Sequence, residues 1–201
     1  MARLIHGVGV NDCGYAVHRA EYAIDERGKK VRTYDWRCPY YKKWSAMITR
    51  CYSDKMISRD PNYADVYVCD EWLKLSSFIR WVDSQPRRDW ENLELDKDIL
   101  FKGNKVYSPE ACVFVSRLTN TFLVKSLNYT KSTGTFFIES KGKYKSSCRN
   151  PFSGKREHLG FFDSEHEAHS AWKRRKCELS VELSKIQTDD RVSKSLGVMF
   201  L

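Results

Sequence analysis

The chain has 201 residues, 41% of them hydrophobic, and a formal net charge of +9. This length allows one large or two small domains with a hydrophobic core. No apolar run reaches the length of a membrane helix, and the start Met1-Ala2-Arg3-Leu4 lacks the apolar core of a signal peptide. Seven cysteines without a close pair favour free thiols in a cytoplasm, and the positive charge favours nucleic acid as partner.

The first 92 residues predict a hairpin and two helices. Residues 7–31 alternate loosely around an Arg27-Gly28-Lys29 turn, which is typical of an N-terminal hairpin. Apolar residues then recur at helical spacing over 41–51 and again over 72–82, and Asp60-Pro61-Asn62 lies in the loop between them. Pro86 ends the second helix. These aromatic-rich stripes indicate core packing.

The next segment contains a pair of strand-like runs followed by a short helix. Residues 93–100 read as a strand, Lys102-Gly103-Asn104 as a turn, and residues 107–115 as a second extended run. Asn120 follows the second run. This β-turn-β-helix order resembles the core of phage HNH endonucleases, in which an Asp-His pair ends the first strand and a last Asn lines the helix.

The resemblance assigns roles to particular residues. Asp96 matches the family's aspartate and Asn120 its last asparagine, which together hold one divalent metal. Lys97 stands where the family has its general base histidine. A lysine is protonated at neutral pH, because its unperturbed pKa is near 10.4. The neighbouring carboxylates Asp96 and Asp98 would raise that pKa further.

Three arrangements would retain cleavage. In the first, Lys97 stabilises charge while the metal alone activates water; in the second, His6 or His18 supplies the base. In the third, Asp96 and Asp98, with Glu110, bind the metal and provide the base. Alternation along a strand places Asp96 and Asp98 on one face. A solvated surface turn is the alternative. The cofactor expected is Mg²⁺ or Mn²⁺, with no organic cofactor.

The segment from about Tyr129 to Lys185 predicts three strands and one helix. The β-prone runs cover residues 135–138, 142–147 and 158–162, each bounded by turn residues. Ser164 and Glu167 form a capping-box pattern, which predicts a helix start. The helix then carries Ala168, Trp172 and Leu179 at spacings that cover one face of a small sheet.

This segment resembles an Apetala-type DNA-binding domain. The resemblance rests on Lys141-Gly142-Lys143-Tyr144 and on residues 155–168, KREHLGFFDSEHEA. In that family a three-stranded sheet lies in the major groove and the helix backs the sheet. Residues 121–185 hold 13 lysines and arginines against 7 aspartates and glutamates, a net charge of +6. The basic residues expected to contact DNA are Lys141, Lys143, Lys145, Arg149, Lys155 and Arg156.

Taken together, the patterns predict an α+β chain with three parts. A degenerate HNH-like ββα core with flanking helices covers 1–124, an Apetala-type domain covers 125–187, and a weakly ordered tail covers 188–201. Docking of the apolar end Val198-Met199-Phe200-Leu201 on the fold is the alternative for this tail. Phage homing nucleases share this order, which implies a metal-dependent endonuclease that nicks or cuts duplex DNA in a bacterial host cytoplasm. A cleavage-inactive DNA-binding repressor or competitor, and an RNA-binding or protein-targeting effector, remain alternatives. Neither a membrane nor a small-molecule substrate is expected.

Overall fold

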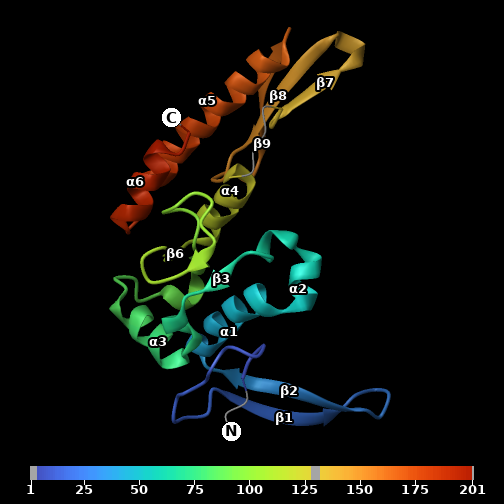
Figure 1. Cartoon of the computed structure of the whole chain (residues 1–201). Helices are drawn as coiled ribbons and strands as arrows, with labels where there is room; N and C mark the ends of the chain where they lie inside the picture. Colours follow the sequence, from blue (N-terminus) through green and yellow to red (C-terminus); the bar gives the residue numbers. More distant parts are fainter. Residues whose placement is uncertain (1–3, 128–131, 201) are drawn as a thin grey trace. The chain divides into compact units, whose positions relative to one another are not determined.

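The computed structural model describes residues 4–127 and 132–200 of the chain (Figure 1). It is a mixed α+β protein with several small sheets, as the sequence predicts. Two compact units are present. The first contains residues 1–91 and 103–112, and the second contains residues 92–102 and 113–201. Residues 1–3, the predicted segment start at Tyr129, and Leu201 lie outside the described residues.

The first unit begins with the predicted hairpin, although its strands span residues 18–37 where residues 7–31 were expected. β1 (His18–Ile24) pairs antiparallel with β2 (Lys30–Arg37). Asp25 Oδ1 accepts hydrogen bonds from the backbone N–H groups of Arg27 and Lys29, at 2.9 and 2.8 Å. Gly28 has φ +73°, a conformation that glycine adopts without a steric penalty. The turn chemistry therefore accounts for the hairpin.

Both predicted helices of the first unit are present. α1 (Pro39–Tyr52) is followed by α2 (Asp54–Arg59), and α3 (Leu75–Ser84) follows the 3₁₀ turns η1 (Pro61–Tyr63) and η2 (Asp70–Leu73). The second helix starts later than expected, because its first residues form η2. Trp44 Nε1 donates a 2.6 Å hydrogen bond to the carbonyl of Trp72, and both side chains are fully buried. A parallel pair, β3 (Tyr67–Val68) and β5 (Val106–Tyr107), completes this unit.

The second unit begins with two short strands and a helix. The turn η3 (Trp90–Asn92) leads into β4 (Glu94–Asp96), which pairs antiparallel with β6 (Val113–Val115). α4 (Arg117–Leu127) follows and packs on β4. The expectation of one strand over residues 93–100 is wrong in extent, because the backbone bends at 97–100.

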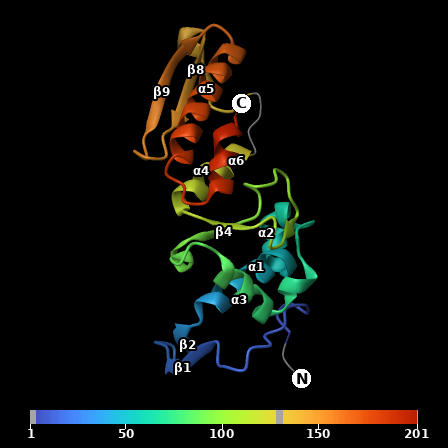
Figure 2. The same cartoon turned by 90° about the vertical axis from the view of Figure 1, so that its left-hand side faces the viewer.

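The predicted three-stranded sheet and its helix are confirmed. β7 (Thr135–Ile138), β8 (Lys143–Arg149) and β9 (Arg156–Phe162) form an antiparallel sheet in the order β7-β8-β9, with the turn η4 (Glu139–Lys141) between the first two. α5 (Glu165–Ser184) packs along all three strands (Figure 2). Ser164 and Glu167 make both hydrogen bonds of the capping box.

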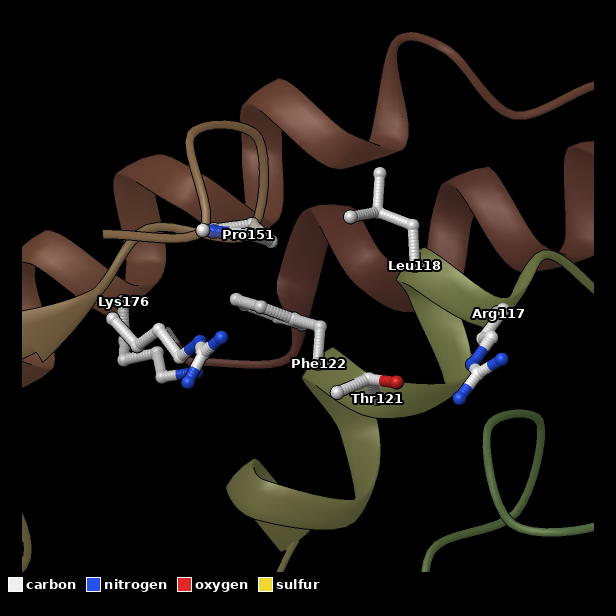
Figure 3. A pocket seen from close by; sticks show the side chains of 8 residues that line it. Arg117, Leu118, Thr121, Phe122, Pro151 and Lys176 are labelled. Carbon is white, nitrogen blue, oxygen red and sulfur yellow. The ribbon is translucent and has the colours of Figure 1, made fainter. Parts of the chain in front are cut away.

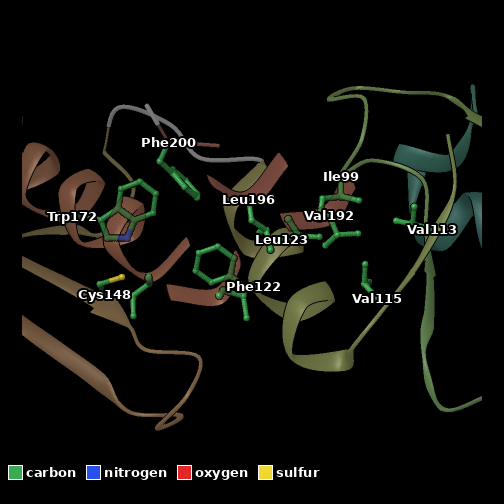
Figure 4. Close-up of a cluster of buried hydrophobic side chains, with 12 residues drawn as sticks. Ile99, Val113, Val115, Phe122, Leu123, Cys148, Trp172, Val192, Leu196 and Phe200 are labelled. Carbon is green, nitrogen blue, oxygen red and sulfur yellow. The ribbon is translucent and has the colours of Figure 1, made fainter. Parts of the chain in front are cut away.

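The expectation of a weakly ordered tail is wrong. Residues Asp190–Val198 form α6, which is capped by Asp189 and packs on α5. Leu196 and Val192 are buried in a cluster that also contains Phe122, Leu123 and Trp172 (Figure 4). α4 therefore shares its core with α5 and α6. The expected domain boundaries at 124 and 187 differ from the limits of the two compact units. The division into domains at these two positions stays a prediction.

All seven cysteines are free. Within the described ranges, no helix combines the length and the apolar character needed to cross a bilayer.

Candidate functional site

The first candidate site is the acidic turn that follows β4. Asp96 ends the strand with 7% of its surface exposed. Its Oδ1 accepts hydrogen bonds from the backbone N–H groups of Asp98 (2.9 Å) and Ile99 (2.8 Å). A carboxylate that accepts from the following N–H groups bends the chain into a turn. Asp96 thus ends the strand two residues before Asp98 and orders residues 97–100.

The electrostatics of this turn are set by burial and by Lys97. Burial raises the pKa of Asp96, and the two backbone hydrogen bonds only partly oppose that shift. Lys97 is itself only 7% exposed, and its Nζ donates a 2.7 Å hydrogen bond to Asp98 Oδ1. Of the two expected carboxylates, Asp98 therefore forms an ion pair with Lys97, and Asp96 accepts the backbone hydrogen bonds of the turn.

Asp96 and Asp98, two of the expected metal ligands, are both engaged in other contacts in this turn. Asp96 and Asp98 do not alternate along one strand, so the prediction that they share a strand face is wrong. Asn120 lies in α4, the helix that packs on β4. Over residues 4–127 and 132–200, no three His, Cys, Asp or Glu side chains are grouped so that they could hold a metal ion.

The other residues considered for cleavage belong to the first unit. His6 Nε2 lies 3.2 Å from Thr49 Oγ1, and His18 Nε2 lies 3.1 Å from an amino group of Arg32. Glu110 is exposed in the same unit. Each histidine thus has a polar partner within its own unit.

The second candidate site is the outer face of the β7-β8-β9 sheet, the face opposite α5. Phe136, Lys145 and Phe161 are paired across the three strands, so they form one row on one face. Phe136 is 51% and Phe161 38% exposed, whereas Ser146 and Cys148 on the opposite face are buried. This face therefore presents two phenylalanine rings on either side of a lysine.

Cations surround these rings. Lys141 Nζ lies 4.0 Å from the centroid of the Phe161 ring, and the Arg156 guanidinium carbon lies 5.9 Å from that of Phe136. Both distances are typical of cation–π contacts. Arg156 pairs with Arg149 across β8 and β9, and its guanidinium also donates a 3.2 Å hydrogen bond to Ser147 Oγ. Two arginines thus lie together at one end of the row.

The remaining predicted DNA contacts lie at the edges of this face. Lys143 Nζ forms a 2.9 Å ion pair with Asp163, although both side chains are largely accessible. Lys155 is exposed in the turn between β8 and β9. The structure therefore places all six predicted residues on the sheet or in the turns beside it.

The consecutive cations of α5, Lys173 to Lys176, differ in exposure. Arg174 is exposed, whereas Lys176 is only 5% exposed. Arg175 binds both oxygens of Glu157 on β9, at 2.7 and 3.1 Å. This bond holds the pKa of Glu157 below its usual value and ties the helix to the sheet.

Sequence reasoning missed two sets of residues. Phe136 and Phe161 were not selected, although alternation from Lys145 and its strand partners places them on the same face. Arg117 at the start of α4 and Lys176 on α5 line one pocket. They were also missed, because the two residues are far apart in the sequence and no short-range pattern relates them. Comparison of the chain with protein-family models, curated proteins and solved structures finds no match.

Proposed function

We propose that the protein binds duplex DNA through the outer face of the β7-β8-β9 sheet. The observation that carries the proposal is the row Phe136–Lys145–Phe161 with Arg149 and Arg156 at its end. The major groove of B-DNA admits β-structure, and cations at the edge of such a sheet neutralise phosphates.

The residue types suit two kinds of contact. Lysines at the margins, such as Lys141 and Lys155, serve phosphates, which position the protein without reading sequence. Arginines can bind guanine edges bidentately, and an exposed phenylalanine can contact a thymine methyl group. Arg149, Arg156 and the two phenylalanines are therefore the residues proposed to give sequence preference.

The test is fluorescence anisotropy of the whole chain with a labelled duplex at several salt concentrations. Replacing Lys141 and Lys145 with Gln is expected to weaken binding and to reduce the slope of log K against log salt by about 2. The control replaces two exposed cations, Arg174 and Lys185 on and after α5, with Gln. Equal losses in both double variants would contradict binding through this face.

A second candidate is cleavage of the bound DNA as an HNH-like endonuclease. The observation in its favour is the order β4-β6-α4, with Asp96 at the end of the first strand and Asn120 in the helix. The test is incubation of supercoiled plasmid with the protein and Mg²⁺ or Mn²⁺, beside Asp96→Asn. Nicking that this variant loses would establish the nuclease; binding without nicking would indicate the cleavage-inactive DNA-binding protein.

A further inference from the structure

The second unit contains a basic pocket beside the sheet. It has a volume of about 300 Å³ and opens between α4, the β8–β9 turn and α5 (Figure 3). The residues that define its character are Arg117, Leu118, Phe122, Arg149, Pro151 and Lys176. Its wall therefore combines three cations with an apolar surface, and none of its described lining residues is acidic.

The three cations reach the pocket from three different elements. Lys176 is only 5% exposed, and its Nζ lies 3.8 Å from the centroid of the Phe122 ring. Arg117 is the first residue of α4, and the first turn of that helix has no acidic residue. A cation at a helix N-terminus is disfavoured by the helix dipole. Helix stability therefore does not explain Arg117, whereas an anion in the pocket would.

The pocket is continuous with the outer face of the sheet. Arg149 ends β8 opposite Arg156 and also lines the pocket. A second hollow of about 200 Å³, lined by Phe136 and Arg156, shares Arg149 and Lys176 with it. Arg149 thus belongs both to the end of the sheet and to the pocket.

We propose that this pocket binds a nucleoside phosphate, with Arg117, Arg149 and Lys176 as the cations that favour the anion. The sugar and base then lie against Leu118, Pro151 and the edge of Phe122. The volume matches the lower end of small-molecule sites, which is more than one phosphate needs. The ligand is either one unpaired nucleotide of a strand that crosses the sheet or a free nucleotide; the first source rests on the proposed DNA binding.

The experiment titrates the whole chain by calorimetry with four probes. These are a 5′-phosphorylated oligo(dT) of six nucleotides, thymidine 5′-monophosphate, thymidine and inorganic phosphate. The variants are Arg117→Gln and Lys176→Met. Methionine at position 176 keeps most of the buried aliphatic part of the lysine side chain and removes the charge. Arg174→Gln is the control for loss of one exposed cation of α5, and circular dichroism verifies folding of each variant.

We expect each pocket variant to bind the phosphorylated nucleotide probes about tenfold more weakly, because a charge-assisted hydrogen bond is lost. Arg174→Gln should leave both affinities unchanged. Tighter binding of the oligonucleotide than of the monophosphate would identify a strand as the source; equal or weaker binding would identify a free nucleotide. Thymidine and inorganic phosphate should each bind more weakly than the monophosphate.

Two results would overturn the proposal. One is inorganic phosphate binding as tightly as the monophosphate, which would leave a simple anion site. The other is nucleotide binding that neither pocket variant reduces. Duplex binding is read separately with Lys141→Gln/Lys145→Gln, whose residues do not line the pocket. If this double variant loses duplex binding but still binds the nucleotide, the two proposals are independent, and each can fail without the other.

Discussion

Gly134 is the position where a single methyl group should be least tolerated. It has φ +82°, and a Cβ atom there would overlap the indole ring of Trp172 at Cδ1. We expect Gly134→Ala to lower the free energy of unfolding by about 3–5 kcal/mol, from the left-handed backbone and the clash together. Urea denaturation followed by circular dichroism measures this loss.

A matched variant separates the two causes. Gly142 has φ +60°, but a Cβ atom added there would meet nothing within 4 Å. Gly142→Ala should therefore cost only the backbone contribution, about 1–2 kcal/mol. Equal losses of unfolding free energy at the two positions would mean that the Trp172 ring does not pack against Gly134.

Asp96 should make the stability of the fold depend on pH in an unusual direction. Burial raises its pKa, so the folded state holds this proton more tightly than the unfolded state. Its contribution is present below the unfolded pKa, near 3.9, and is lost as the pH rises through the folded value. Because Asp96→Asn removes this titration, the unfolding free energy of the variant minus that of the wild type should increase over this range.

Glu157→Gln provides a control of opposite sign. Arg175 lowers the pKa of Glu157, so its stabilisation is present at neutral pH and is lost as the pH falls. The same difference should decrease with rising pH for this variant. Urea denaturation at several pH values measures both, and a pH-independent difference for Asp96→Asn would mean that Asp96 is well solvated.

At the scale of elements, α6 should be part of the folding unit. Leu196 is fully buried in the cluster with Trp172 and Phe122. We expect Leu196→Ala to lower the free energy of unfolding by about 2–5 kcal/mol. Val198→Ala, at a side chain that is 65% exposed, should change it by less than about 0.5 kcal/mol. Two similar small effects would instead indicate a weakly packed C-terminal segment.

The elements that the sequence predicted well are those with local determinants. The capping box at Ser164 and Glu167 and the turn at Gly28 involve contacts within a few residues. α6 was missed because its stability comes from burial against α5, which is a tertiary effect. β4 was predicted too long because the side chain of Asp96 competes for the N–H groups of the next residues.

At the scale of the whole molecule, the sequence predicted where the basic residues lie better than it predicted which side chains contact one another. The strand pattern, the family resemblance and the net charge together pointed to residues 121–185, and all six predicted cations lie on or beside one sheet. At the acidic turn, short-range spacing did not show that Lys97 pairs with Asp98, and the metal site there stays a prediction. The pocket was missed because its lining comes from α4, the β8–β9 turn and α5, which only the folded chain brings together.

The most direct measurement is an amide NMR titration of the ¹⁵N-labelled whole chain with a DNA duplex. Chemical-shift changes are expected in β7, β8 and β9, centred on Phe136, Lys145 and Phe161. The changes should be weak for the exposed residues of α5. They should fade as salt is added, because phosphate neutralisation releases counterions. Shifts that centre on α5 or on the first unit, with the sheet unchanged, would contradict duplex binding through the outer face.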